Sequence, residues 1–381
     1  MNNKKKIAIF IDWFLPAYKA GGPITSVSNL VSALSEQFDF YIITSDRDIG
    51  DNASFENIET DIWQMKDTYQ IIYLSPSKQN LKFIQKIITD QKFDKIYING
   101  IFSLEFSILP LYIAKKIYNH NDIIIAPRGM LSEQAFAKKN FKKKLFLKTA
   151  KIFGLFSGVN FQATTGKEFL DIKNKFNTDQ IKEITNLPRI VSDSDFSTKI
   201  KESNKLKLVS IARISQEKNT LFAIKVLSKI TTGKITLDLY GPIVETHYWK
   251  SCKEAIKRLP KNVQVNYKGA ISSDKIPEIY KNNHFAFIPS VGENFGHSIY
   301  EAMSFGCPVI ISDATPWQNL EEKQIGWDIS LSNQQKFVDV IKLCLKMNQQ
   351  DYNIMSEKVF NFAKDYIANS DLITLSKTLF E

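Results

Sequence analysis

Glu293 and Glu301 lie eight positions apart in the stretch "GENFGHSIYEAMSFGCPVIIS". The apolar run 284–290 predicts a buried strand, 296–306 predicts a helix of about three turns, and 308–312 predicts the next strand. A carboxylate therefore stands on each side of a loop–helix junction. Ligands of α/β sheets bind at the carboxyl ends of strands, where the amides of a helix N-terminus accept anions. The two acids fit a ligand with phosphate between two polyhydroxy groups, although a first-turn acid and a solvated helix residue would look the same.

Cations and glycines follow other predicted strands. Arg213 comes just past the first strand of the second half, and Lys218 is five residues later in "SIARISQEKN". Two cations at a strand end suit a diphosphate, although exposed loop charges would give the same pattern. Gly21 and Gly22 follow the first strand of the chain, where a missing Cβ lets a ligand approach the backbone. A simple turn explains this pair equally well.

Composition limits the class of protein. The chain has 381 residues, 44% hydrophobic and 24% charged, enough for two domains with separate cores. Its three cysteines, Cys252, Cys307 and Cys344, are widely spaced, which fits neither a disulfide framework nor a zinc site. Asp12 interrupts the apolar run after the N-terminal lysines, against a secretory signal, and no stretch reaches the roughly 18 apolar residues of a membrane span. We therefore expect a cytoplasmic protein.

Strand and helix patterns alternate along the chain, and the alternation restarts near the middle. The first series runs from "KIAIFID" to "GVNFQATT", and a second begins at "KLKLVSIAR". Two such series predict an α/β protein with two doubly wound, Rossmann-like domains that face each other across a cleft. We expect an N-terminal domain at 1–187, a linker at 188–204 and a C-terminal domain at 205–364. A last helix at 365–381 could cross back to the N-terminal domain.

A basic segment accounts for part of the net charge of +10. Residues 138–151, "KKNFKKKLFLKTAK", contain seven lysines and no acid, with apolar residues at near-helical spacing. Such a segment can be a solvated face or a basic amphipathic helix on an anionic membrane surface. No nucleic-acid motif accompanies it, so we expect no nucleic-acid partner.

These motifs together resemble a retaining glycosyltransferase of family four (glycosyl transferases group 1) with the GT-B fold. The resemblance covers nearly the whole chain, and Glu293-x7-Glu301 with Arg213 and Lys218 upstream is its most specific part. "APRGMLS" and "SDATPW" are similar to a subset of the family that builds bacterial surface polysaccharides. The resemblance implies transfer of a hexose from a UDP- or GDP-linked donor to a glycan acceptor, often lipid-linked, with retention of configuration. It also implies a location in the cytoplasm, with peripheral contact between 138–151 and the anionic inner membrane.

The resemblance also implies roles for individual residues. Glu293 would contact the donor hexose, Glu301 the ribose hydroxyls, and Arg213 and Lys218 the diphosphate that departs; Glu293, Arg213 and Lys218 are thus the candidate catalytic residues. The other expected donor-binding residues are the glycine loop, a strand-end arginine, two residues near the base and the loop and helix start between the glutamates: Gly21, Gly22, Arg128, Ala270, Ile271, Asn294, Phe295, Gly296, His297 and Ser298. Many relatives have a histidine at the position of Arg128, which cannot act as a base.

No metal or other cofactor is expected. The cations and the helix dipole can stabilise the leaving diphosphate, and the Asp-x-Asp match in "SDSD" (192–195) falls in the expected linker.

Three other classes are less consistent with the motifs. A nucleotide-sugar 2-epimerase would use the same cleft and the same cations. A nicotinamide-dependent dehydrogenase would need the complete G-x-G-x-x-G pattern, which "GGPITS" lacks. A basic binding protein would not need Glu293 and Glu301 at one site.

Overall fold

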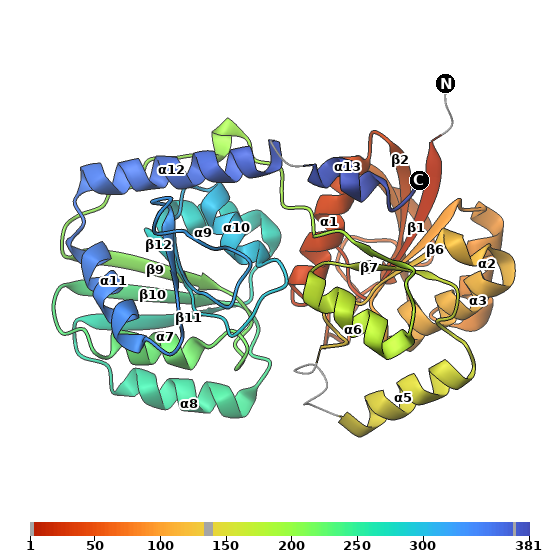
Figure 1. The fold of residues 1–381 in the computed structure, drawn as a ribbon, viewed down its shortest axis with the longest axis horizontal. Helices are drawn as coiled ribbons and strands as arrows, with labels where there is room; N and C mark the ends of the chain where they lie inside the picture. The colour runs from red at the N-terminus through yellow and green to blue at the C-terminus, as the bar shows by residue number, and fades with distance from the viewer. Residues whose placement is uncertain (1–3, 133–139, 369–370) are drawn as a thin grey trace. The chain divides into compact units, whose positions relative to one another are not determined.

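The chain divides into two compact units in a computed structural model that describes residues 4–132, 140–368 and 371–381. Unit 1 comprises Met1–Leu187 and Asp371–Glu381, and unit 2 comprises Pro188–Ser370. Each unit has its own sheet, covered by helices on both faces (Figure 1). The expected α/β class with two Rossmann-like domains is therefore confirmed.

Unit 1 contains an eight-stranded sheet in the order β3-β4-β2-β1-β5-β6-β7-β8. All neighbouring strands are parallel except β3 and β4. The order reverses between β1 and β5, which is where doubly wound sheets bind ligands. The strands are β1 Lys5–Ile11, β2 Phe38–Ser45, β3 Trp63–Met65, β4 Tyr69–Leu74, β5 Lys95–Asn99, β6 Ile123–Ala126, β7 Asn160–Ala163 and β8 Ile181–Glu183.

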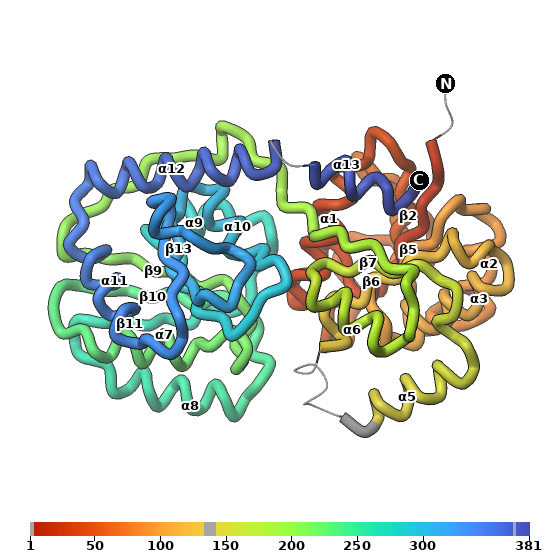
Figure 2. The backbone as a smooth tube through the Cα atoms, in the orientation of Figure 1, coloured from red at the N-terminus to blue at the C-terminus, as the bar shows by residue number. Residues whose placement is uncertain are grey.

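The helices of unit 1 cover two apolar clusters, one on each face of the sheet. The C-terminal segment belongs to this unit: α13 contacts α1, and Phe380 lies fully buried among aromatic residues of the sheet. Figure 2 shows this blue segment beside the red start of the chain. The helices are α1 Gly22–Leu34, α2 Leu81–Gln91, α3 Leu109–Ile117, α5 Asn140–Ile152, α6 Gly166–Phe176 and α13 Leu372–Lys377, with a π-helix, η1, at Leu104–Ile108 and a 3-10 turn, η2, at His120–Asp122.

Unit 2 contains a six-stranded, fully parallel sheet in the order β11-β10-β9-β12-β13-β14. Numbered within the unit, this is the 3-2-1-4-5-6 order of dinucleotide-binding sheets, with its reversal between β9 and β12. The strands are β9 Lys205–Ile211, β10 Lys234–Tyr240, β11 Val263–Gly269, β12 Phe285–Ile288, β13 Val309–Ser312 and β14 Gly326–Ile329. The helices are α7 Thr220–Leu227, α8 Thr246–Lys257, α9 Ile276–Asn282, α10 His297–Ser304, α11 Gln334–Lys346 and α12 Gln349–Ala368, with 3-10 turns η3 Asp193–Asp195 and η4 Ser273–Lys275.

Residues 188–204, expected as a linker, are packed into unit 2. Two lysines in this stretch are buried because each ammonium group binds carbonyls at the end of a helix, where the helix dipole favours a cation. Lys199 Nζ donates to the carbonyls of Phe305 and Gly306 at 2.8 and 2.7 Å. Lys201 Nζ donates to the Met347 carbonyl at 3.1 Å. The stretch therefore closes the ends of α10 and α11.

Candidate functional site

The reversal point of the unit 2 sheet carries the predicted donor residues. Arg213 and Lys218 lie in the loop after β9, and Glu293 lies in the loop after β12. These strands are neighbours in the sheet, with Phe285 paired to Leu208. The carboxyl ends of parallel strands lie at one edge of the sheet, so the loops that follow β9 and β12 are adjacent there. The sheet order, which the sequence did not specify, is what brings these residues together.

Lys218 and Glu293 form a close ion pair. Lys218 Nζ lies 2.6 and 2.7 Å from the two carboxylate oxygens of Glu293, and Ser290 Oγ donates to one of them at 2.7 Å. The two side chains are only 15% and 9% exposed. Water screens such a pair weakly, so both groups keep a defined orientation. Lys218 and Glu293, expected to contact different parts of a ligand, thus contact each other when no ligand is bound.

Arg213 is the more available cation of the two. Its side chain is 42% exposed and pairs loosely with Glu217, at 3.5 Å. Backbone bonds from Ala212 to Tyr240 and from Ile214 to Pro242 fix the loop on both sides of it. A guanidinium on a rigid loop with one weak partner can bind a phosphate with little rearrangement.

The loop between Glu293 and α10 presents backbone donors to the same edge. Gly296 is the N-cap of α10 at φ +78°, and no side chain caps the helix there. A Cβ at Gly296 would meet Ile299 Cδ1 at 3.0 Å and Trp317 Nε1 at 3.3 Å, so only glycine fits this conformation without strain. Trp317 Nε1 also donates to the Phe295 carbonyl at 2.7 Å.

The rest of this segment is packed around the helix start. The Phe295 side chain is buried, with its ring centroid 4.8 Å from that of His297, and Asn294 and Ser298 are half-buried. Helix α10 has eight residues and is shorter than the expected three turns. It ends at Ser304, two residues before Gly306, whose φ is +62°. The segment can therefore bind an anion through its backbone amides while its side chains hold the loop in place.

Glu301 lies in the second turn of α10, and its carboxyl group has a perturbed pKa. Withdrawal from water raises this pKa to about 7, and the charge of Arg189 offsets part of that effect. The Arg189 guanidinium itself binds Ser304 Oγ at 3.1 Å and Asp195 at 3.0 Å. A buried carboxyl group without a direct cation can accept hydrogen bonds from ligand hydroxyls at modest desolvation cost.

Ala270 and Ile271 immediately follow β11, at the edge of the sheet and two strands away from β9. Both are half-buried. Neighbouring β10 ends at Gly241, whose backbone comes so close to Ala212 that a Cβ would lie 2.1 Å from its carbonyl oxygen. This close approach holds the strand ends of β9 and β10 together beside the predicted base site.

Gly21 and Gly22 belong to unit 1, where they begin α1. Gly21 has φ +67°, and a Cβ at either glycine would meet no atom within 4 Å. The loop before them is anchored by the Asp48 carboxylate, which accepts from the amides of Tyr18 and Lys19 at 2.9 and 3.1 Å. The space over the two glycines is open, as a loop that approaches a ligand requires.

Arg128, also in unit 1, is held by uncharged acceptors. Its Nε donates to Asn99 Oδ1 at 2.7 Å, and its two terminal nitrogens donate to the Asn186 side chain and the Tyr97 hydroxyl. Its φ of +55° is unusual for a residue with a side chain. Arg128 follows β6, and its two hydrogen bonds to β5 and one to the segment after β8 make it a cross-link at this edge; two of its five N–H groups remain for a ligand.

Two groups that could have suggested other chemistry are occupied. The aspartates of "SDSD" bind cations: Asp193 pairs with Lys364 at 2.6 Å and Asp195 with Arg189. The His284 ring binds the Lys207 amide and the Ile200 carbonyl; burial lowers its pKa to about 4, although the hydrogen bond to Ile200 opposes this effect. Among the described residues, no group of three or more His, Cys, Asp or Glu side chains could hold a metal.

Sequence reasoning missed the residues that position the site. Ser290 orients Glu293, Trp317 holds the loop carbonyl, and Arg189 sets the field around Glu301. Ser290 could have been inferred from its place two residues after the end of β12. Arg189 carried no local signal, because 115 positions separate it from Ser304, to which it binds.

A family model and solved structures were compared with the chain. The model "Glycosyl transferases group 1" matches residues 192–361. No curated protein sequence matches.

Similar solved structures cover the whole chain at low identity. HepE of Anabaena, solved with UDP and glucose, has a TM-score of 0.67 at 16% identity, and the alignment covers 98% of each chain. WaaG, a glycosyltransferase involved in lipopolysaccharide biosynthesis, has a TM-score of 0.62 at 13% identity, with 98% of each chain covered. The trehalose-6-phosphate synthase OtsA has a TM-score of 0.69 at 9% identity, again with 98% of each chain covered. The fold is therefore GT-B.

Proposed function

We propose that this protein is a glycosyltransferase that moves a hexose from a nucleoside diphosphate donor to a glycan acceptor with retention of configuration. The observation that carries the proposal is the convergence of Arg213, Lys218 and Glu293 at the reversal point of unit 2, with Glu301 on the adjoining helix. The match of this region to a group 1 glycosyltransferase model supports the same activity.

Each residue has a role in this reaction. The bond between the anomeric carbon and the diphosphate oxygen breaks, a bond from the acceptor oxygen forms on the same face of the sugar, and the proton of the acceptor hydroxyl passes to the departing diphosphate. Arg213 and Lys218 stabilise the negative charge that develops on the diphosphate, without a metal. Glu293 faces the sugar, where a carboxylate favours the positive charge of the transition state, and Glu301 accepts hydrogen bonds from the ribose.

The donor is proposed to be a UDP- or GDP-hexose. HepE, a structural relative, is solved with UDP-glucose, which favours UDP as the first nucleotide to test. A 2-epimerase would use the same residues, but WaaG and OtsA, which share the fold, carry the names of a transferase and a synthase. Release of epimerised nucleotide sugar in the absence of acceptor would favour the epimerase.

The acceptor is proposed to be lipid-linked, within bacterial surface polysaccharide synthesis on the cytoplasmic face of the inner membrane. Helix α5 supports this part of the proposal. Its outward positions combine exposed lysines with Leu145, which is 51% exposed. The helix ends at Ile152, and Ile152 and the next residue, Phe153, are 71% and 85% exposed. Lysines interleaved with exposed apolar groups are typical of helices that bind anionic bilayer surfaces. None of the described helices could itself span a bilayer.

The division of labour between Glu293 and Arg213 is tested by two substitutions. Glu293→Gln should lose the transfer step, because it removes the carboxylate that favours the positive charge of the transition state. It should not lower UDP affinity, because Lys218 is released from its ion pair and stays available to the diphosphate. Arg213→Ala should lower UDP affinity by about 1.5–3 kcal/mol, the contribution of a hydrogen bond to a charged group. Affinity is measured by calorimetry and transfer by single-turnover assay, after a nucleotide-sugar panel has identified the donor by thermal stabilisation.

Glu254→Gln is the matched control, because Glu254 is an exposed acid of unit 2 that pairs with Lys257 on the same helix, α8. It should change neither quantity. If Glu293→Gln keeps the full transfer rate, or loses as much UDP affinity as Arg213→Ala, the assigned roles are wrong.

A further inference from the structure

A cavity lies at the amino edge of the unit 2 sheet, at the opposite end of the strands from the proposed donor residues. Its volume is about 390 Å³, within the range of pockets that hold small molecules. Asn204 immediately precedes β9 and Arg213 lies in the loop after it, so a seven-residue strand, roughly 20 Å long, separates the two places. The polar lining residues of the cavity are Asn204, Lys229, Thr231, Thr232, Lys342 and Lys346.

Close packing between chain segments forms the floor of this cavity. Gly233 has φ +68°, and a Cβ placed on it would lie 2.6 Å from Leu345 Cδ2 and 2.9 Å from the Asn204 carbonyl oxygen. The Asn204 amide also donates to the Leu345 carbonyl at 2.8 Å. On the other side of the loop, the Asn262 side chain donates to the Thr232 carbonyl at 3.2 Å. These contacts fix the backbone, so the cavity has a defined shape.

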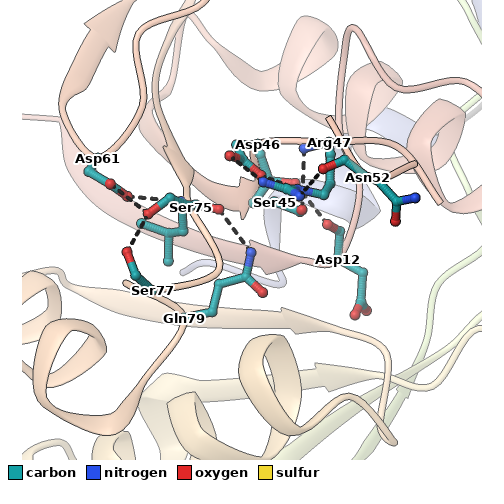
Figure 3. A network of polar contacts seen from close by, with 11 residues as sticks. Asp12, Ser45, Asp46, Arg47, Asn52, Asp61, Ser75, Ser77 and Gln79 are labelled. Atoms are coloured by element: carbon teal, nitrogen blue, oxygen red, sulfur yellow. Dashed lines mark hydrogen bonds and ion pairs between the residues drawn. The ribbon is translucent and has the colours of Figure 1, made fainter. Parts of the chain in front are cut away.

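The cavity is lined by three lysines that have no ion-pair partner. Figure 3 shows how a cation elsewhere in the chain is paired, since Arg47 binds both carboxylate oxygens of Asp46. By contrast, the ammonium groups of Lys229, Lys342 and Lys346 form no hydrogen bond or ion pair with any residue that the structure describes. No acidic residue is found among the described lining residues either. The cavity therefore concentrates positive charge.

The end of the neighbouring helix does not account for these lysines. Cations near a helix C-terminus often bind its last carbonyl groups. At the end of α11 these carbonyls have other donors, because Lys201 Nζ binds the Met347 carbonyl. In the same way, Ser203 Oγ donates to the Lys346 carbonyl at 3.3 Å. Lys342 and Lys346 are also four positions apart on α11, where like charges destabilise a helix, and a bound anion would offset this repulsion.

The lining groups suit a ligand with several phosphate groups. An ammonium group is a point-charge partner for phosphate oxygens, and hydroxyl and amide groups can donate to further oxygens. The side chains of Thr231, Thr232 and Asn204 form no hydrogen bond with the described residues, so these donors are available. Lys229 follows α7, and the other two lysines lie on α11. Charges from two helices around a volume of this size match a polyphosphorylated molecule better than a single phosphate ion.

We propose that this cavity binds a small anion that carries two or more phosphate groups. The site is separate from the proposed transferase site, because it lies at the other edge of the sheet, and the inference does not depend on that function. The phosphate groups can belong to a soluble molecule or to a lipid headgroup. The ligand is bound and not transformed, so no reaction is assigned to the cavity.

The test titrates the full chain with sodium tripolyphosphate in a calorimeter, at low salt and with UDP present to fill the proposed donor site. The wild type should bind tripolyphosphate, and more weakly as salt is added. Lys342→Gln with Lys346→Gln should lower this affinity at least tenfold, because hydrogen bonds to a charged group are lost. Thr232→Val should lower it about two- to tenfold, because one hydroxyl donor is lost while the net charge stays the same.

Lys253→Gln with Lys257→Gln is the matched control. It removes two lysines at the same spacing from α8, and neither of them lines the cavity. Because the loss of net charge is the same as in the cavity double variant, general attraction between the protein and the anion falls equally in both. The control should therefore bind tripolyphosphate like the wild type.

A second arm distinguishes a soluble ligand from a lipid headgroup. Sedimentation with vesicles that contain phosphatidic acid is measured for chains that already carry Lys144→Glu with Lys148→Glu, so that α5 contributes little. If the added cavity double variant lowers sedimentation more than the added control, the site takes a lipid headgroup. Equal sedimentation, with tripolyphosphate binding lost only in the cavity variant, assigns the site to a soluble molecule.

Three results would overturn the inference. The first is a wild type that binds neither tripolyphosphate nor, through the cavity, phosphatidic acid. The second is a control double variant that loses as much affinity as the cavity double variant, which would show attraction by general charge. The third is tripolyphosphate binding that survives either change to the cavity, the paired lysine substitutions or Thr232→Val.

Discussion

At the scale of single residues, the charged groups of the candidate site in unit 2 differ in whether they already have an ion-pair partner. Lys218 and Glu293 neutralise each other, Arg213 is partly free, and Glu301 lacks a direct cation. In the proposed function, an entering donor would meet one available cation, Arg213, and one carboxyl group, Glu301, whose pKa is raised to about 7. This arrangement makes the first contacts with a nucleotide dependent on Arg213 and on the protonation of Glu301.

Nucleotide affinity should depend on pH through Glu301. Its pKa of about 7 means that the carboxylate, the better acceptor for ribose hydroxyls, forms only as the pH rises through neutrality. UDP should bind more tightly to the wild type at pH 8 than at pH 6. Glu301→Gln should bind UDP more weakly at pH 8 by about 1.5–3 kcal/mol, and the difference should shrink at pH 6. Calorimetry at both pH values checks this, and comparison with the variant removes the titration of the nucleotide phosphate itself.

The same group affects stability with a definite sign. The folded pKa lies above the ordinary value of 4.5, so the contribution of Glu301 to stability is fully present below pH 4.5 and is lost as the pH rises through about 7. Without ligand, Glu301→Gln should therefore be more stable than the wild type at pH 8, by up to about 3 kcal/mol. Equal stability at pH 8 would mean that water reaches the carboxyl group.

At the scale of elements, α5 presents exposed lysines and the exposed Leu145 on its outward face. It packs through Phe146, whose ring lies 5.8 Å from Phe102 and 6.3 Å from Phe156. Lys143 is not part of the outward face, because its ammonium group lies 5.1 Å from the Phe102 ring centroid. Residues 138 and 139 of the basic segment lie outside the part of the chain that the structure describes.

Lys144→Glu with Lys148→Glu should weaken binding to anionic vesicles. Each lysine near such a surface contributes about 1 kcal/mol, and a reversal of charge adds repulsion. The matched control is Lys82→Glu with Lys86→Glu, which has the same spacing on exposed positions of α2. Sedimentation with phosphatidylserine vesicles at low salt measures the effect. Equal binding of the two double variants would show that general charge, and not α5, attracts the membrane.

At the scale of the whole molecule, each unit is built around its own sheet. The chain reaches unit 1 twice, since its last eleven residues return there after unit 2 is complete. Phe380 is central to this return: its ring packs edge-on against Phe38 at 5.4 Å and against Phe40 and Tyr97, both at 5.8 Å. Tyr97 in turn holds Arg128, so the C-terminal segment supports the edge where that residue lies.

Phe380→Ala should destabilise unit 1 by about 3–5 kcal/mol, the usual effect of removing a buried aromatic ring. Urea unfolding should show a transition of unit 1 at a lower urea concentration, and scanning calorimetry should show it at a lower temperature. The unit 2 transition should still move upward with UDP, because the donor residues there have no contact with this segment. An unchanged unfolding profile would contradict the structural role of the C-terminal segment.

The sequence by itself determined the two βα series and the residue types of the donor site. Strands and glycine-terminated helices are local patterns. The same holds for Glu293-x7-Glu301 and for Arg213 with Lys218, because each set lies within one short stretch of sequence. The βα pattern of the first series stops near 187, where the first segment of unit 1 also ends. Alternation of this kind results from short-range preferences that each segment carries alone.

Only the tertiary structure decided which of these groups meet. The Lys218–Glu293 ion pair joins residues 75 positions apart. Likewise, three long-range hydrogen bonds make Arg128 a cross-link, and burial alone gives Glu301 its pKa near 7. Strand order and burial arise from packing between segments distant in sequence. No local pattern encodes them, because the free energy that selects them depends on the whole core at once.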